Sequence, residues 1–210
     1  MRINEPDHGS GVKRIFGRPR SYIRILPQAW SGSDKADRHD LLLGDWGGFS
    51  WGATRGGVVT YPGTISLPQF EKVHAITKRF SGTGEVWATR TNISGKHNER
   101  TFLYGDEVVA DWASFLRYAL PHMVEGGAKF PFKVKLGIAG LTDLHWPSEA
   151  PFDGSPVALD DNFEVEFTLS TTEPDEAFGA ILDAWVKLRS VFSVSEPSMS
   201  QQQAIKFRLR

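Results

Sequence analysis

Apolar and polar residues alternate along three segments of the chain, at residues 21–27, 130–141 and 163–169. A period of two is typical of a strand with one buried face, so each segment is predicted to be a β-strand. In the last segment the carboxylates of Glu164 and Glu166 fall on one side and the apolar residues on the other. We therefore expect a sheet with one face turned to solvent.

Two other segments repeat their apolar residues at helical spacing. The first runs from about Asp106 to Leu120 and has acidic residues in its first turn, and Pro121 is expected to end or kink it. The second runs from about Pro174 to Phe192, with the proline near its first turn. Strands and helices together predict an α+β fold, a mostly antiparallel sheet with two main helices packed on it.

The middle of the chain is harder to interpret. Residues 58–61 are rich in β-branched side chains and predict a strand. Residues 66–80 fit either a capped helix or a strand. The glycine-containing turn at 81–84 and the strand-like residues 85–91 favour a hairpin, so strand is placed at least over residues 74–80.

The inward positions of the most periodic segments are predicted to share one core and to be the least accessible residues. These positions are Ile23, Ile25, Trp112, Phe115, Leu116, Val134, Leu136, Ile138, Val165, Phe167, Leu182 and Trp185. We expect a single α+β domain over residues 21–192. It is preceded by a flexible, glycine-containing lead-in at 1–20 and followed by a basic C-terminal tail at 193–210.

Composition narrows the class of protein. The 210 residues include no cysteine, which excludes disulfides and thiolate metal sites and fits a reducing cytoplasm. No apolar run reaches the roughly twenty residues of a membrane span, and the N-terminus has no signal core. We expect a cytoplasmic protein without membrane contact.

Charge is unevenly distributed although the formal net charge is only −1. Both ends of the chain are basic, whereas residues 143–185 contain no lysine or arginine. The basic ends either meet as a phosphate-binding patch or are solvated tails. The candidate nucleic-acid contacts are Lys13, Arg14, Arg18 and Arg20. The acidic stretch would limit a nucleic acid to one side of the domain.

An aromatic and glycine-rich segment offers a second candidate site. Trp46, Phe49 and Trp51 stand among glycines, which leave the ring faces uncovered, and Arg55 follows them. If these residues are exposed they form a stacking surface for a ligand or partner. The alternative is that the rings belong to the core.

Short motifs along the chain resemble a known bacterial region. The strings at residues 54–61, 116–120, 131–141 and 181–185, taken in this order, resemble the region that follows the Schlafen AlbA-type DNA-binding domain in many uncharacterised bacterial proteins. The likeness covers roughly residues 20–192. It implies an accessory domain, acting alone or beside a partner that supplies the chemistry. The AlbA-type domain itself is not recognisable in the chain, so the resemblance assigns no functional residue.

One motif raises the question of catalysis. Residues 48–52 match the G-x-S-x-G pattern around Ser50, and Asp143 and His145 follow in hydrolase order. That motif needs a helix after the serine, whereas glycines and a β-branched strand follow Ser50. The histidines have no metal-binding spacing. No catalytic residue, metal or cofactor is assigned.

The sequence thus predicts a non-enzymatic accessory or regulatory binding module, and the resemblance implies that it belongs to a nucleic-acid-associated bacterial system. It would act through a protein partner or by self-association. Direct nucleic-acid binding by the basic ends and the aromatic segment is the first alternative. A small serine hydrolase using Ser50 is the second.

Overall fold

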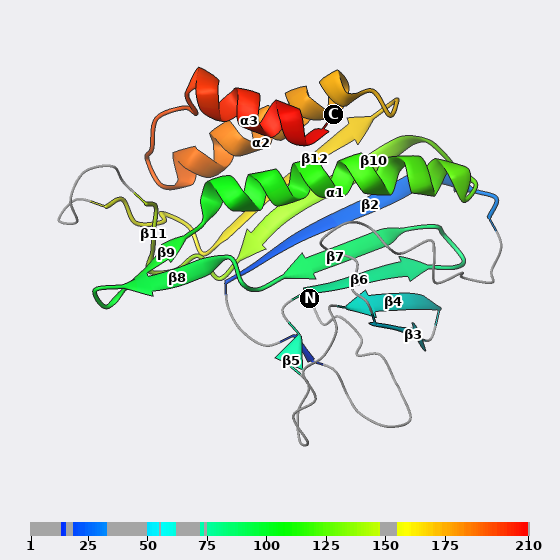
Figure 1. Cartoon of the computed structure of the whole chain (residues 1–210), viewed down its shortest axis with the longest axis horizontal. Coiled ribbons are helices and arrows are strands. Elements are labelled where there is room, and N and C mark those ends of the chain that lie inside the picture. Colours follow the sequence, from blue (N-terminus) through cyan, green and yellow to red (C-terminus); the bar gives the residue numbers. More distant parts are fainter. Residues whose placement is uncertain are drawn as a thin grey trace.

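The computed structural model describes residues 14–15, 19–32, 50–54, 56–61, 72–73, 75–147 and 155–209. Within these residues the chain has the predicted α+β fold, with helices packed on one face of a large antiparallel sheet (Figure 1).

The large sheet is built from seven strands. They are β2 (Arg20–Trp30), β3 (Ser50–Thr54), β4 (Gly57–Tyr61), β6 (Ala75–Phe80), β7 (Val86–Arg90), β10 (Ala128–Ala139) and β12 (Asn162–Leu169). Their order is β12-β10-β2-β7-β6-β4-β3, and neighbouring strands are antiparallel throughout. The hairpin expected around residues 81–84 is confirmed, because β6 and β7 pair across that turn. The early strand β2 therefore lies in the middle of the sheet.

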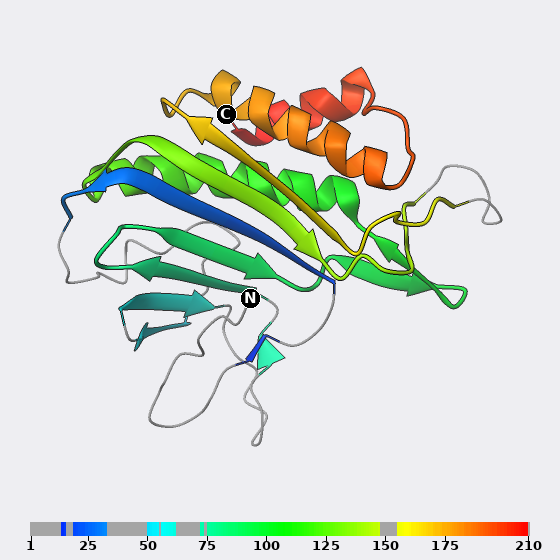
Figure 2. The same cartoon turned by 180° about the vertical axis from the view of Figure 1, so that it is seen from behind.

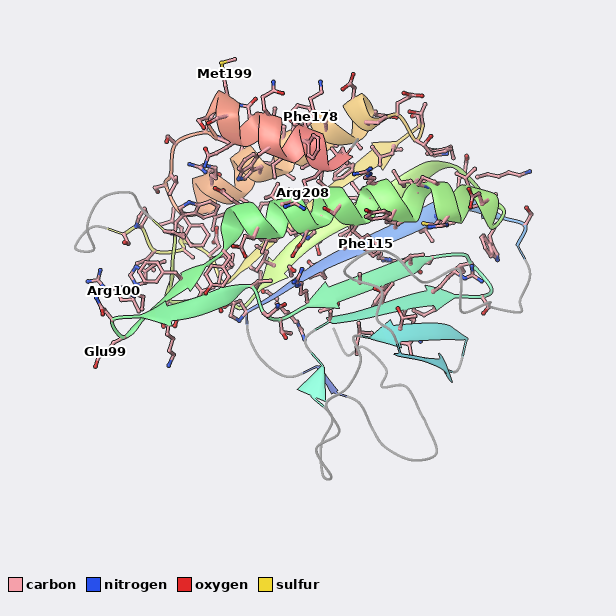
Figure 3. The ribbon with its side chains drawn as sticks, in the orientation of Figure 1. Glu99, Arg100, Phe115, Phe178, Met199 and Arg208 are labelled. Carbon is pink, nitrogen blue, oxygen red and sulfur yellow. The ribbon has the colours of Figure 1, made fainter. Side chains whose placement is uncertain are left out.

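Two smaller sheets accompany it. Strand β1 (Arg14–Ile15) pairs in parallel with β5 (Lys72–Val73). A hairpin of β8 (Ser94–His97) and β9 (Arg100–Leu103) is extended in parallel by β11 (Leu144–His145). Figure 3 shows Glu99 and Arg100 at the tip of this hairpin, away from the helices.

The described residues form three helices, two of which pack directly on the large sheet. Helix α1 (Gly105–Glu125) crosses in front of β10 and β2 in Figure 1, and α2 (Pro174–Val191) packs on β12 and α1. Helix α3 (Met199–Leu209) lies against both α1 and α2. Among the helices of the described chain, none combines the length and the apolar character needed to cross a bilayer.

The core lies between these helices and the sheet. Most of the predicted core residues are buried there, and Ile23, Trp112 and Trp185 are at most 1% exposed. Val165, Phe167 and Leu182 are only partly buried, against the prediction. Strand β12 is an edge strand, so its inward side chains are enclosed less completely than those of β10 and β2.

The first helix is longer than predicted. It contains Pro121 and continues to Glu125, so of the two effects expected of this proline, an end or a kink, the end is wrong. Pro121 lacks the N–H that would bond the carbonyl of Arg117, one turn earlier. Both residues are exposed, and water can hydrate that carbonyl instead.

The segment expected to be a basic tail contains a packed helix. Ile205 and Leu209 of α3 are each 4% exposed within the core. Lys206 Nζ also lies 2.9 Å from Asp175 Oδ1 of α2. Residues 199–209 are therefore an integral layer of the fold.

Candidate functional site

Strand β2 places its alternate side chains on opposite faces of the large sheet. Ile23 and Ile25 point toward the helices and are buried, whereas Tyr22 and Arg24 point the other way and are partly exposed. No helix of the described chain covers this second face of the sheet. Figure 2 shows the molecule from the side opposite α1. We call it the helix-free face.

The strand register extends this face across the sheet. Its side chains are those of Arg20, Tyr22, Arg24 and Leu26 on β2, Lys133 and Lys135 on β10, Glu164 and Glu166 on β12, Ile76, Lys78 and Phe80 on β6, and Glu85, Trp87 and Thr89 on or beside β7.

Rings and cations gather at the centre of the helix-free face, in what we call the Trp87 cluster: Arg24, Lys78, Phe80, Glu85 and Trp87. The ring centroids of Phe80 and Trp87 are 5.6 Å apart in an edge-to-face arrangement, at an interplanar angle of 63°. The guanidinium of Arg24 lies 5.4 Å from the centre of the Trp87 ring. The ammonium of Lys78 lies 4.5 Å from the centre of the Phe80 ring. Both cations therefore lie within cation–π range of an aromatic ring.

Glu85 fixes the orientation of this cluster. Its Oε1 accepts hydrogen bonds from Arg24 Nε and from Trp87 Nε1. The Glu85 residue is 8% exposed, so the carboxylate is held in place by both donors and is largely shielded from water. The indole of Trp87 is thus locked between its hydrogen bond and the cation beside its ring.

A second polar group lies beside the cluster, toward β12. Tyr22 Oη donates to Glu164 Oε2 over 2.6 Å, and Lys135 Nζ donates to Glu164 Oε1 over 2.8 Å. Gly137 provides the space for the Tyr22 ring, since a Cβ at that position would lie 2.3 Å from it. The hydrogen bond from Lys135, and then that from Tyr22, lowers the pKa of Glu164, while burial raises the pKa of Tyr22 above its ordinary value.

The sequence-predicted site residues are only partly covered by the structure. Arg20 begins β2 and belongs to the helix-free face. Trp51 lies in β3 and Arg14 in β1, with side chains outside the described part of the chain. The remaining candidates, Trp46, Phe49, Arg55, Lys13 and Arg18, also lie outside the described residues.

Two of the basic residues near the C-terminal end are paired within the described chain. Arg189 is 7% exposed, and its Nη1 lies 3.4 Å from Asp106 Oδ1. Lys206 is paired with Asp175. These two cations hold helices together and are not available as a phosphate-binding surface.

Sequence reasoning missed the Trp87 cluster, although part of its signal was present. In β2, Arg24 lies between two isoleucines. In β7, Trp87 likewise occupies a position that alternates with inward-facing side chains. The alternation indicated that both side chains leave the core. Only the register reveals that they lie opposite each other.

The hydrolase motif lacks its structural context. Ser50 begins strand β3, which is followed by the antiparallel strand β4 and not by a helix. His145 Nδ1 lies 3.1 Å from the carbonyl oxygen of Ser155. Within the described residues no group of three or more metal-ligating side chains comes together.

A cleft of about 220 Å³ between α1, α3 and the end of β7 is the main competing site. The guanidinium of Arg90, which lines this cleft, already donates hydrogen bonds to Asp111 Oδ2 over 2.6 Å and to Asn92 Oδ1 over 2.7 Å. Arg208 of α3 adds a second cation to its lining (Figure 3). Glu107 and Asp111 balance these two charges, so the cleft shows no preference for an anion.

Comparisons of the chain with protein-family models, curated proteins and solved structures find no match.

Proposed function

We propose that this chain is a non-enzymatic binding domain and that its helix-free face binds single-stranded nucleic acid. The observation that carries the proposal is the row of Lys78, Trp87 and Arg24, which are directly opposite one another on β6, β7 and β2. Single-strand binding surfaces combine cations for the backbone with aromatic rings for the bases. The Trp87 cluster has both elements within one small area.

The charge of the helix-free face supports this proposal. Among the described residues, basic side chains outnumber carboxylates on this face, and two of its three carboxylates lie on one edge strand. Glu164 and Glu166 lie on the edge strand β12, whereas Lys78 and Arg24 lie in the interior of the sheet. A nucleic acid strand would therefore cross β2, β7 and β6 and avoid β12.

The test is binding of a fluorescently labelled oligothymidylate, followed by anisotropy at low salt. Trp87→Ala should weaken binding by about 1–3 kcal/mol, the usual contribution of one base–aromatic stack. Phe207→Ala is the matched control, because Phe207 is a 76% exposed ring on α3 rather than on the helix-free face. An absence of binding at low salt, or equal losses in both variants, would refute the proposal.

A protein partner is the second candidate, and one observation favours it. Met199 and Phe207 of α3 are 80% and 76% exposed, and Figure 3 shows Met199 pointing away from the fold. Such side chains suit a protein contact, as expected of an accessory subunit in a bacterial, cytoplasmic nucleic-acid system. Light scattering on the purified chain tests self-association. A monomer at all concentrations would leave only a partner of different sequence.

A further inference from the structure

Lys78 differs from the other cations of the helix-free face. The residue is 9% exposed, and within the described chain its ammonium makes no ion pair or hydrogen bond. Among the described residues, its ammonium contacts the ring of Phe80. Arg24 is paired with Glu85 and Lys135 with Glu164, so their charges are already compensated.

This arrangement is costly for the protein alone. An ammonium removed from water without a carboxylate loses hydration that a single ring contact does not fully replace. Burial accordingly lowers the pKa of Lys78. In the register Lys78 is flanked by Trp87 and by Val59, which is 1% exposed, so neither neighbouring strand supplies a counter-charge.

Building on the proposed function, we infer that Lys78 binds a phosphate group of the nucleic acid, with Phe80 and Trp87 beside the adjoining base. Lys78 and Trp87 lie directly opposite each other, which matches a ligand that joins an anion to a flat group. A lone carboxylate would use only Lys78. A nucleotide would use both the ammonium and the ring.

The experiment compares Lys78→Met with Lys133→Met, an exposed lysine on the same face. Each variant is melted alone, with inorganic phosphate, with thymidine monophosphate and with oligothymidylate. Lys78→Met should melt no lower than the parent protein without ligand, because a buried unpaired charge is removed. Its affinity for oligothymidylate should fall about tenfold, and the slope of log affinity against log salt should shrink by about one.

The control should retain the affinity of the parent protein to within about threefold. Equal losses in the two lysine variants would overturn the inference. An unchanged affinity of Lys78→Met for oligothymidylate would also overturn the inference. In that case the proposed function would remain intact, because oligothymidylate still binds. If inorganic phosphate or the monophosphate raises the Tm through Lys78 but oligothymidylate does not bind, the phosphate site stands and the proposed function fails.

A measurement on the unmodified protein covers the case in which Lys78→Met does not fold. Lysines are acylated with acetic anhydride in the presence and absence of oligothymidylate, and the peptides are quantified by mass spectrometry. Bound ligand should protect Lys78 at least about tenfold more than it protects Lys129, which is exposed on β10. Equal protection of both lysines would refute a specific contact.

Discussion

Trp185 of α2 donates a hydrogen bond from its indole Nε1 to Asp106 Oδ1 of α1, over 3.1 Å. The other carboxylate oxygen of Asp106 accepts a hydrogen bond from Gln201 Nε2 of α3, over 2.9 Å. Arg189 approaches the same carboxylate from α2. One side chain in the first turn of α1 therefore connects all three helices.

Replacing Asp106 by alanine should lower the free energy of unfolding by about 2–4 kcal/mol, because the buried guanidinium of Arg189 loses its counter-charge. Urea denaturation at neutral pH measures the change. Asp183→Ala, which removes an exposed carboxylate from α2, should stay within about 0.5 kcal/mol of the parent protein. Equal stabilities of the two variants would show that Asp106 does not join the helices.

Trp112 allows a second test of stability. Its side chain is fully buried, and its ring centroid lies 6.3 Å from that of Phe163. Trp112→Ala should cost about 3–5 kcal/mol through the cavity it leaves. Trp112→Phe should cost less than half as much, because the buried Nε1 has no hydrogen-bond partner among the described residues. Thermal unfolding followed by circular dichroism distinguishes these outcomes, and an unchanged Tm for Trp112→Ala would contradict the position of the core.

Glu164 should contribute to acid sensitivity. Its pKa is lowered in the folded protein, mainly by the hydrogen bond from Lys135, so folding favours the charged form. The contribution is present above the ordinary value of 4.5 and is lost as the pH falls through the lowered pKa. Glu164→Gln should therefore lose less stability than the parent protein between pH 7 and pH 3, measured by urea denaturation.

The control for this pH effect is Asp183→Asn, which removes an exposed carboxylate from the opposite side of the sheet. It should reproduce the acid response of the parent protein. A Glu164→Gln variant with the same acid response as the parent would mean that the contact with Lys135 is not maintained in solution.

The turn of the β8–β9 hairpin holds two residues at positive φ, Asn98 at 46° and Glu99 at 65°. Glycine is the preferred second residue of such a turn, because a side chain there is strained. Glu99→Gly should stabilise the protein by about 0.5–1 kcal/mol. Lys96→Gly, in the adjacent strand, should destabilise it, and a Glu99→Gly variant with a lower Tm than the parent would contradict the turn geometry.

The periodic segments allowed most of the fold to be predicted. Strand β12 alternates along its length, β10 alternates from Phe132 to Leu136, and α1 and α2 carry broad apolar stripes. Helix α3 was missed because its apolar residues do not lie on one side: Ile205 and Leu209 are buried whereas Met199 and Phe207 are exposed. Its packing is decided by contacts with α1 and α2, which a local pattern does not encode.

The candidate site was harder to predict from the sequence than the fold, because it also depends on contacts between distant segments. Lys78 and Trp87 belong to one hairpin, and their approach could be inferred from the turn at residues 81–84. Arg24 reaches Trp87 only because β2 inserts between β7 and β10, which no local pattern indicates. The pairing of distant strands thus determines the composition of the candidate site.

The central place of β2 also constrains the order in which the chain folds. Residues 20–30 are synthesised well before β10, yet most of their strand pairings are with β10, which begins at Ala128. Until β10 is synthesised, one edge of β2 has unpaired backbone groups that can pair with another nascent chain. Contacts so distant in sequence also slow folding. This topology therefore leaves one edge of β2 open to pairing with other chains until the second half of the domain has been synthesised.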